Sequence, residues 1–383
     1  MNKNILITGG RFPSALDLIR NLSKSGNKVM VAETTLINYC STSKANAKNI
    51  VIESPRGNEE NYINKLLEII DTEKIDLLIP AWEEALVISK YLDKFPKNLP
   101  FTSDFTLVHA LHNKWEFFHL VKKLGFNTPA TIQISKEEDF TSIPFPSFYL
   151  KYSYSRGSNG TIHVKKGEAF PKMDLSSRNS VLAQEELKGR PYCTYSICHK
   201  GEVKAHATYP VHYEKLSPTV SRGRYCFSFE EVNHPKILKT IIEFVKKTGY
   251  TGSLAFDIFD EAGEIYFLEC NPRITSGLTL LTSHQNLDEA FFNCNKTMLQ
   301  PKEGEKKQML CPALFFGTKS AIKNGSFKPY LKTLLTTSDL IFNIKDIKPF
   351  FFQFVIGMYQ IILKFRHKKG ATSAFSHDLD FEG

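Results

Sequence analysis

The chain of 383 residues lacks the cysteine spacings of a metal site or a disulfide framework. Its seven cysteines form no CxxC pair, and their odd number predicts reduced thiols in a cytoplasmic protein. No long apolar stretch follows the first lysine, so we expect no signal peptide. Internal repeats and low-complexity linkers are also missing, and a chain of this length then predicts two or three packed domains.

A basic run interleaved with aromatic residues, which is typical of nucleic-acid interfaces, is absent as well. The net charge is +9, yet Lys and Arg occur along the whole chain, and the one dense stretch is KFRHKK at 364–369. This distribution favours anionic small molecules such as ATP as partners and argues against nucleic acid.

Short apolar segments alternate with segments of helical spacing over the first hundred residues. The expected strands are Ile5–Thr8, Val29–Ala32, Asn49–Ile52 and Asp76–Pro80, with helices around 15–22 and 63–70. Such alternation predicts a parallel α/β sheet. From residue 113 the pattern changes to a helix and then paired strands, so we expect an α/β module followed by an α+β module.

The segment TGGRFP, after the first strand, has only part of a dinucleotide-binding fingerprint. That fingerprint needs three glycines and an acid after the second strand. Gly9, Gly10 and Glu33 are present, but Arg11 and Ser14 occupy the other two glycine positions. Two interpretations stay open: an NAD site, or a Rossmann-like scaffold whose glycines only turn the chain into a helix.

The segment LAFDIFDEAGEIYFLECNPR (254–273) carries the strongest chemical signal. Alternation along a strand puts Glu269 and Asn271 on one face. If the turn is the odd-length loop Glu261–Gly263, Asp257 faces Phe267 and lies one diagonal step from Glu269. Two carboxylates and an amide oxygen are ligands that Mg²⁺ prefers beside nucleotide phosphates. We therefore expect a metal site, the alternative being a hairpin with an exposed polar face.

Two weaker signals precede this hairpin. In FYLKYSYSRGSNGT (148–161), Lys151 ends an apolar strand, and the loop with Gly157 and Gly160 can surround phosphates with backbone N–H groups. In VLAQEELKG (181–189), an apolar strand turns polar and can offer backbone groups to an adenine ring. Each segment alone would be taken for an ordinary loop or strand end.

The order of these motifs resembles the ATP-grasp superfamily, and most closely proteins similar to the carbamoyl-phosphate synthase large chain. A lysine before a helix, a strand lysine with a Gly-rich loop, Q-E-E-L-x-G, and Asp…Glu-x-Asn-x-Arg follow one another between Lys114 and Arg273, and the resemblance covers roughly residues 1–310. The resemblance implies a Rossmann-like pre-ATP-grasp domain (1–112), a two-subdomain ATP-grasp domain (113–310) and a C-terminal helical basic extension (311–383).

The resemblance also implies roles for individual residues. The ATP site would consist of Lys114 and Lys151 at the phosphates, Gly157 and Gly160 in the phosphate loop, and Gln184, Glu185 and Leu187 at the adenine. One or two Mg²⁺ (or Mn²⁺) would be held by Asp257, Glu269 and Asn271. Arg273 would stabilise charge on the transferred phosphoryl group, and Arg156 would bind a substrate carboxylate or the γ-phosphate. Pro191 stands where the family often has a ribose-binding acid, so Glu185 or Glu186 would replace it.

In ATP-grasp proteins the strand ends of the first domain usually face the second substrate. This makes Arg11, Glu83 and Glu84 candidates for contacts with that substrate, because each lies just after a predicted strand. Glu83 and Glu84 equally fit acids in the first turn of a helix, where they interact with its dipole.

The segment PFFFQFVIGMYQIIL (349–363) is apolar and has lysines on both sides. It is short for a transmembrane helix. We expect a helix packed on the body, with a basic interfacial helix over 349–369 as the alternative.

These observations predict an ATP- and Mg²⁺-dependent ligase, acting as a monomer or homodimer. It would activate a carboxylate as an acyl phosphate and transfer the acyl group to an amine. No glutaminase signature is present, so nitrogen would come from ammonia or an amino substrate. Carbamoyl-phosphate-type synthesis, an NAD(P)-dependent oxidoreductase and a catalytically silent ATP-binding protein stay open as alternatives.

Overall fold

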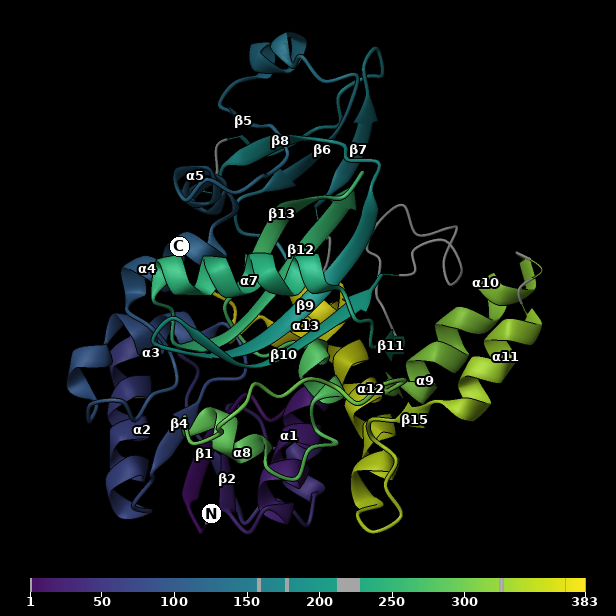
Figure 1. Cartoon of the computed structure of the whole chain (residues 1–383). Helices are drawn as coiled ribbons and strands as arrows, with labels where there is room; N and C mark the ends of the chain where they lie inside the picture. The colour runs from purple at the N-terminus through teal and green to yellow at the C-terminus, as the bar shows by residue number, and fades with distance from the viewer. Residues whose placement is uncertain are drawn as a thin grey trace.

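The computed structural model describes residues 2–156, 160–175, 179–211, 228–323, 325, 327–368 and 370–382. Its N-terminal part is a parallel sheet in the order β3-β2-β1-β4, at the bottom of Figure 1. The strands are β1 (Asn4–Thr8), β2 (Lys28–Glu33), β3 (Lys48–Val51) and β4 (Leu77–Ile79). The connecting helices are α1 (Pro13–Lys24), η1 (Tyr39–Thr42), α2 (Glu59–Thr72), α3 (Glu84–Lys90) and η2 (Leu92–Lys94). The parallel sheet expected from the alternating pattern is confirmed.

Strands β1, β2 and β4 of this sheet are apolar and largely buried on both faces, whereas the edge strand β3 is partly exposed. Along β1, Ile5 and Ile7 join one hydrophobic cluster while Leu6 joins another, because successive side chains point to opposite faces. Gly9 has a φ of +69° at the turn into α1. A Cβ on Gly10 would lie 2.5 Å from Val31 Cγ1, so the backbone approaches β2 too closely for a side chain.

Two antiparallel sheets follow, one above the other in Figure 1. The upper sheet has the order β5-β8-β6-β7 and consists of β5 (Thr131–Ile134), β8 (Val181–Glu185), β6 (Ser147–Tyr152) and β7 (Ile162–Lys165), with η3 (Glu137–Ser142) beside it. The middle sheet has the order β10-β9-β12-β13 and consists of β10 (Glu202–Pro210), β9 (Arg190–His199), β12 (Gly252–Glu261) and β13 (Glu264–Asn271). Helices α4 (Phe105–His112), α5 (Lys114–Lys123) and α7 (Pro235–Thr248) complete this part.

The middle sheet separates two hydrophobic clusters. Tyr195 and Ile197 share a cluster with residues of β1 and α1, whereas Phe256 and Phe267 pack with Phe244 of α7. The sheet is therefore enclosed between the N-terminal module and α7, as the predicted α+β module requires.

The predicted register of the β12–β13 hairpin is wrong. The turn is the two-residue loop Ala262-Gly263, with φ values of +53° and +83°, because Glu261 pairs with Glu264. A bulge then shifts the register between Asp257 and Ile258, since Ile258 pairs with Phe267 but Asp257 pairs with Glu269. Asp257 thus lies directly opposite Glu269, closer than the diagonal step expected from the sequence.

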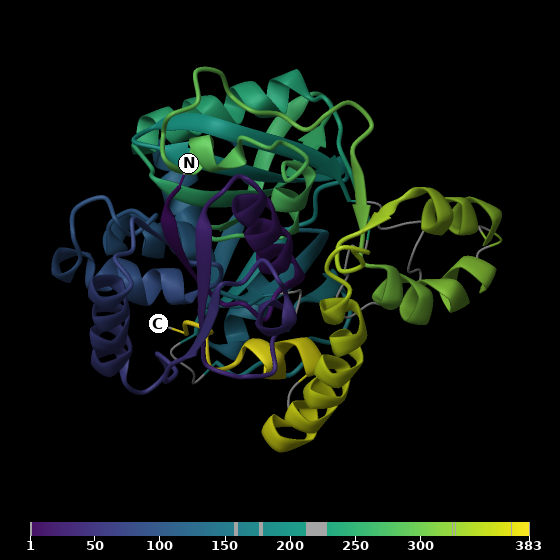
Figure 2. The ribbon, with the colours of Figure 1, turned by 90° about the horizontal axis from the view of Figure 1, so that it is seen from below.

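The C-terminal region adds short elements and then returns to the body. After the middle sheet come η4 (Ser276–Leu280) and α8 (Leu287–Phe291), and a small sheet joins β11 (Ser228–Glu230), β14 (Lys306–Gln308) and β15 (Ser338–Asp339). The helices are α9 (Leu310–Pro312), the π-helical η5 (Ala313–Gly317), α10 (Thr318–Lys323), α11 (Phe327–Thr336), α12 (Lys348–His367) and α13 (Ala371–Ser376). Figures 1 and 2 show α10 and α11 projecting from the body, while the end of the chain lies beside α4.

Gly189, in the connection from the upper to the middle sheet, provides a stability prediction. A Cβ there would lie 2.8 Å from Glu261 Cα and against the Asp260 carbonyl, so Gly189→Ala forces backbone apart. We expect the substitution to lower the free energy of unfolding by about 1–3 kcal/mol in urea denaturation. Gly357→Ala in α12 is the control, because its Cβ meets open space and alanine favours a helix. Equal stabilities of the two variants would contradict the close approach.

Candidate active site

Asp257 and Glu269 form a half-buried pair of carboxylates on adjacent strands of the middle sheet. Burial and the facing Glu269 raise the pKa of Asp257. Burial opposes ionisation of Glu269 as well, but the nearby Lys114 and Lys151 ammonium groups outweigh it and lower the pKa of Glu269. Two carboxylates this close do not both ionise easily without added positive charge. The pair is therefore suited to a cation.

Two lysines approach this pair from different elements. Lys114, the first residue of α5, has its Nζ 3.3 Å from Glu269 Oε2 and donates to the Ser155 carbonyl at 2.6 Å. Lys151 of β6 donates to Gln184 Oε1 at 2.7 Å, and burial lowers its pKa to about 8. Both ammonium groups thus lie between the upper and middle sheets, as phosphate-binding side chains would.

Arg273 extends the site from the hairpin towards the parallel sheet. Its NH2 donates to Asn271 Oδ1 at 3.1 Å, and its guanidinium lies 3.7 Å from the centre of the Trp82 ring. Its buried Nε has no hydrogen-bond partner among the described residues. A buried N–H without an acceptor costs free energy, which an anionic ligand accepting from it would recover.

The donor set fits a hard divalent cation such as Mg²⁺. Asp257 and Glu269 provide carboxylate oxygens, and Asn271 lies two residues on along the same face of β13. Within the described part of the chain, no group of three or more His, Cys, Asp or Glu side chains is placed to hold a metal ion. The predicted set, with two acids and an amide, leaves the remaining positions to water and phosphate, as is usual for Mg²⁺.

The other predicted nucleotide residues lie around the connection between the two antiparallel sheets. Gln184 is buried near the end of β8, where its Nε2 donates to Thr131 Oγ1 at 3.1 Å. Glu185 is the last residue of β8 and Leu187 lies in the connecting segment; both are half-buried, and Gly160 has a φ of +73° before β7. Gly157 lies outside the described residues.

Glu83 and Arg156 form a second buried polar group beside Arg273. Arg156 Nε and NH2 donate to the Glu83 carboxylate at 2.8 and 2.6 Å, and Arg156 NH1 lies 3.2 Å from Asp380 Oδ2. Burial would raise the pKa of Glu83, but neighbouring cationic groups, Arg156 among them, lower it to about 2. Burial lowers the pKa of His112 to about 4, so this neighbour of Glu83 is neutral at pH 7.

Glu84 acts as a first-turn acid of α3. Its Oε1 accepts from the backbone N–H groups of Ala81 and Trp82, both at 3.0 Å, and from the Thr8 hydroxyl. This is the dipole-type role that the sequence left open, and the side chain is fully buried. Glu84 thus stabilises the turn between β4 and α3.

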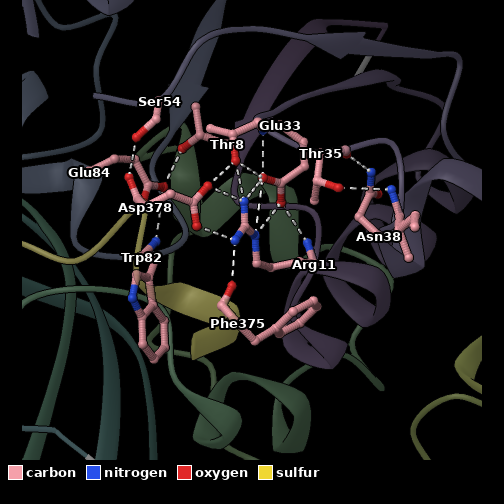
Figure 3. A network of polar contacts seen from close by, with 12 residues as sticks. Thr8, Arg11, Glu33, Thr35, Asn38, Ser54, Trp82, Glu84, Phe375 and Asp378 are labelled. Carbon is pink, nitrogen blue, oxygen red and sulfur yellow. Dashed lines mark hydrogen bonds and ion pairs between the residues drawn. The ribbon is translucent and has the colours of Figure 1, made fainter. Parts of the chain in front are cut away.

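Arg11 is engaged by the C-terminal segment (Figure 3). Its NH2 lies 2.5 Å from Glu33 Oε1 and its NH1 lies 2.6 Å from Asp378 Oδ1. NH1 also donates to the Phe375 carbonyl, and the residue is only 2% exposed. In this conformation the Arg11 guanidinium has its acceptors within the chain, so it is closed to a substrate.

Four residues that line this side of the site were not predicted from the sequence. Trp82 stacks on Phe12, with ring centres 4.2 Å apart, and donates from its Nε1 to Asp380 Oδ1 at 3.0 Å. The other three are His112, Asp378 and Asp380. Trp82 lies in the segment IPAWEE, which the sequence had already marked as the end of a strand. No local pattern, in contrast, links HDLDFE at 377–382 to residues about 300 positions earlier.

A separate cavity of about 660 Å³ lies away from all of these groups. It is lined by Phe101, His199 and Thr251, among others, and contains no predicted site residue. The chemistry of the carboxylates, lysines and arginines, rather than cavity size, therefore identifies the candidate site.

Comparisons with known proteins agree with this geometry. Residues 111–277 match the model of the ATP-grasp domain. No curated protein is detectably similar in sequence. Among solved structures, an L-amino acid ligase from Bacillus licheniformis is 15% identical, with a TM-score of 0.57 over 79% of this chain and 75% of that chain.

Two further structures share the fold. N5-carboxyaminoimidazole synthetase from Staphylococcus aureus, complexed with ADP, is 13% identical, with a TM-score of 0.60 over 79% of this chain and 80% of that chain. The biotin carboxylase domain of 2-oxoglutarate carboxylase from Hydrogenobacter thermophilus, in complex with MgADP and bicarbonate, is 14% identical, with a TM-score of 0.57 over 79% and 72%. Residues 111–277 therefore match an ATP-grasp domain, and most of the chain shares its fold with these three structures.

Proposed function

We propose that the protein is an ATP- and Mg²⁺-dependent ligase that joins a carboxylate to an amine. The observation that carries this proposal is the half-buried Asp257–Glu269 pair, close to Lys114 and Lys151 and to Arg273, whose Nε has no partner among the described residues. Acidic groups for a metal and basic groups for phosphates converge here between two sheets. The fold shared with an amino acid ligase and with ADP-bound synthetases supports the same activity.

In this proposal each group of residues binds one part of ATP or the Mg²⁺ ion. Lys114 and Lys151 would bind phosphate oxygens, and the segment with Gln184, Glu185 and Leu187 would hold the adenine. Glu186 already lies 3.2 Å from His163, so Glu185 is the better candidate for the ribose. Asp257, Glu269 and Asn271 would hold Mg²⁺, which supplies positive charge to the phosphates when bound.

The reaction would proceed through an acyl phosphate. A carboxylate oxygen attacks the γ-phosphorus, the bond to the β-phosphate oxygen breaks, and ADP leaves. The amine then attacks the acyl carbon, loses a proton, and inorganic phosphate leaves. Arg273 would stabilise the charge on the transferred group, and Arg156 would bind the carboxylate. Closure of the upper sheet over the middle sheet would keep water from the intermediate.

The same proposal divides the chain into three parts. Residues 1–112 would form the pre-ATP-grasp domain, residues 113–310 the catalytic domain, and residues 311–383 an extension. Trp82 and Glu83, at the end of β4, adjoin Arg273 and Arg156, which supports a second-substrate site between the first two parts. Asp380 adds a residue of the extension to that site.

An ADP-release screen tests the activity. The full chain, ATP and Mg²⁺ are combined with single carboxylates, single amines and their pairs, and ADP is measured by a coupled assay. We expect release that requires a carboxylate, increases when an amine is added, and is lost on chelation of the metal and restored by Mg²⁺ or Mn²⁺. ATP binding without release for any pair would instead favour the catalytically silent alternative.

Two further assays distinguish the ligase from the remaining alternative functions. Release with bicarbonate and ammonia alone would favour carbamoyl-phosphate-type synthesis. Binding of NAD(P) without binding of ATP would favour the oxidoreductase. Against the latter, Glu33, the acid that would bind the ribose of NAD, accepts from the Arg11 backbone N–H and its guanidinium and from Thr34 N.

A further inference from the structure

The outward face of α12 is an apolar stripe that no described residue covers. Seven large apolar side chains recur at helical spacing and are 37–74% exposed: Phe351, Phe354, Val355, Met358, Ile361, Ile362 and Phe365. We call these seven residues the α12 stripe. Exposed apolar patches of this extent on a folded chain mark interaction sites.

The opposite face of α12 already packs on the protein. Ile356 and Leu363 are buried with Phe375 of α13, and partly buried Ile37 and Tyr39 contact the same cluster. The helix packed on the body, as expected from the sequence, is therefore confirmed for one face. Since that face fixes the helix, the α12 stripe needs a different explanation.

Charge around the α12 stripe is strongly one-sided. Residues 311–370 contain 10 Lys and Arg but only 2 acids, whereas the other 323 residues contain 39 Lys and Arg and 38 acids. Nearly all of the net charge of +9 therefore comes from this region. Lys348 begins α12, and Lys364, Arg366 and Lys368 lie exposed at its other end.

The two acids of this region are directed into the protein. Asp346 lies 2.9 Å from Arg20 and accepts from the Ser43 hydroxyl at 2.6 Å. Asp339 accepts from the backbone N–H groups of Leu310 and Phe342, both at 2.7 Å. The described surface beside the α12 stripe is thus cationic as well as apolar.

We propose that the α12 stripe and its flanking lysines and arginines bind the surface of an anionic lipid membrane. An apolar face with cations at both ends is the pattern of a helix that lies in a membrane interface. A second copy of the chain fits less well, because pairing two stripes in either direction brings cationic helix ends together. Among the described residues, no helix is long and apolar enough to cross a membrane.

The geometry allows this contact without blocking the candidate site. In both views α12, α10 and α11 project on one side of the molecule, away from the hairpin β12–β13. Further exposed apolar residues occur on the same C-terminal region, including Phe342, Ile344 and Leu335, which are 47%, 77% and 78% exposed. Membrane binding is therefore independent of the proposed ligase activity.

Vesicle flotation of the full chain tests the proposal. Vesicles of phosphatidylcholine with about one third phosphatidylglycerol are compared with pure phosphatidylcholine. We expect at least about tenfold tighter binding to the anionic vesicles, weakened by added salt. Phe354→Ser/Met358→Ser/Ile361→Ser and Lys364→Glu/Arg366→Glu are each expected to reduce that binding more than about tenfold.

Matched substitutions on the body serve as controls. Ile242→Ser and Lys239→Glu/Lys246→Glu change exposed residues of α7 and are expected to leave flotation unchanged. Circular dichroism melting confirms that each variant folds. The proposal is overturned if the full chain does not float with anionic vesicles, or if the α7 variants lose binding as strongly as the α12 variants. A concentration-dependent dimer broken by the stripe variant, without vesicle binding, would identify a second copy as the occupant.

Discussion

Glu269→Gln is expected to lower substrate-dependent ADP release at least about 100-fold. The substitution keeps the shape of the side chain but removes one of two half-buried carboxylates that would hold Mg²⁺. It also leaves Lys114, whose Nζ lies 3.3 Å from Glu269 Oε2, without its anionic partner. Both effects weaken the site where the phosphates of ATP would lie, so affinity for MgADP should fall together with turnover.

Glu264→Gln is the matched control for this variant. Glu264 lies on the same strand, but it is exposed and pairs with Lys236 at the turn, far along the hairpin from the pair. We expect it to retain activity within about twofold, because exposed ion pairs contribute little. Titration calorimetry with MgADP measures binding directly. Full ADP release by Glu269→Gln, with unchanged MgADP affinity, would remove Glu269 from the metal site.

The elements of the fold were predictable from the sequence because their patterns are local. The four short apolar segments of the first hundred residues lie within one residue of β1 to β4. The helix Pro235–Thr248 ends at Gly249, whose φ of +67° suits a helix C-terminus. Each of these features depends on periodicity and on one or two turn residues, which a sequence displays directly.

The hairpin illustrates a prediction that was right about the face and wrong about the register. Asp257 and Glu269 do lie on one face, because alternation along each strand holds on both sides of the bulge. The bulge contains no glycine or proline that would reveal it in the sequence. The turn is one residue shorter than predicted, and the bulge shifts the register by one further residue. Together these differences place Asp257 closer to Glu269 than expected.

The surroundings of Arg11 and Arg156, where we propose the second substrate to bind, could not be predicted, because the C-terminal segment forms part of them. Asp378 contacts Arg11, and Asp380 contacts Arg156 and Trp82, across some 220–370 positions of sequence. No helical or strand period connects such residues. Arg11 was predicted from its place after β1, and that place is correct, but its partners were not foreseeable.

Arg11→Met is expected to lower the free energy of unfolding by about 3–5 kcal/mol. The guanidinium is buried and pairs with Glu33, whose side chain is fully buried, so its removal leaves an uncompensated carboxylate in the interior. It also removes the donors to the Phe375 carbonyl and to Asp378, which hold the C-terminal segment (Figure 3). Urea denaturation of the full chain measures the loss, and Lys65→Met, at the exposed pair with Glu68, is the comparison.

Two further variants separate the contributions of Glu33 and Asp378 to this loss of stability. Arg11→Met/Glu33→Gln should be more stable than Arg11→Met alone, because a neutral amide costs less to bury unpaired than a carboxylate. Asp378→Asn should cost only about 1 kcal/mol, since Asp378 is one-third exposed and solvent screens its pair. Burial opposes ionisation of Asp378, but the effect of Arg11 is larger and lowers the pKa of Asp378. The stability that this ion pair contributes is therefore fully present above the unfolded pKa of Asp378. It is lost as the pH falls through the lower pKa of the folded state. If Asp378→Asn costs as much as Arg11→Met, the C-terminal segment rather than Glu33 accounts for the burial of Arg11.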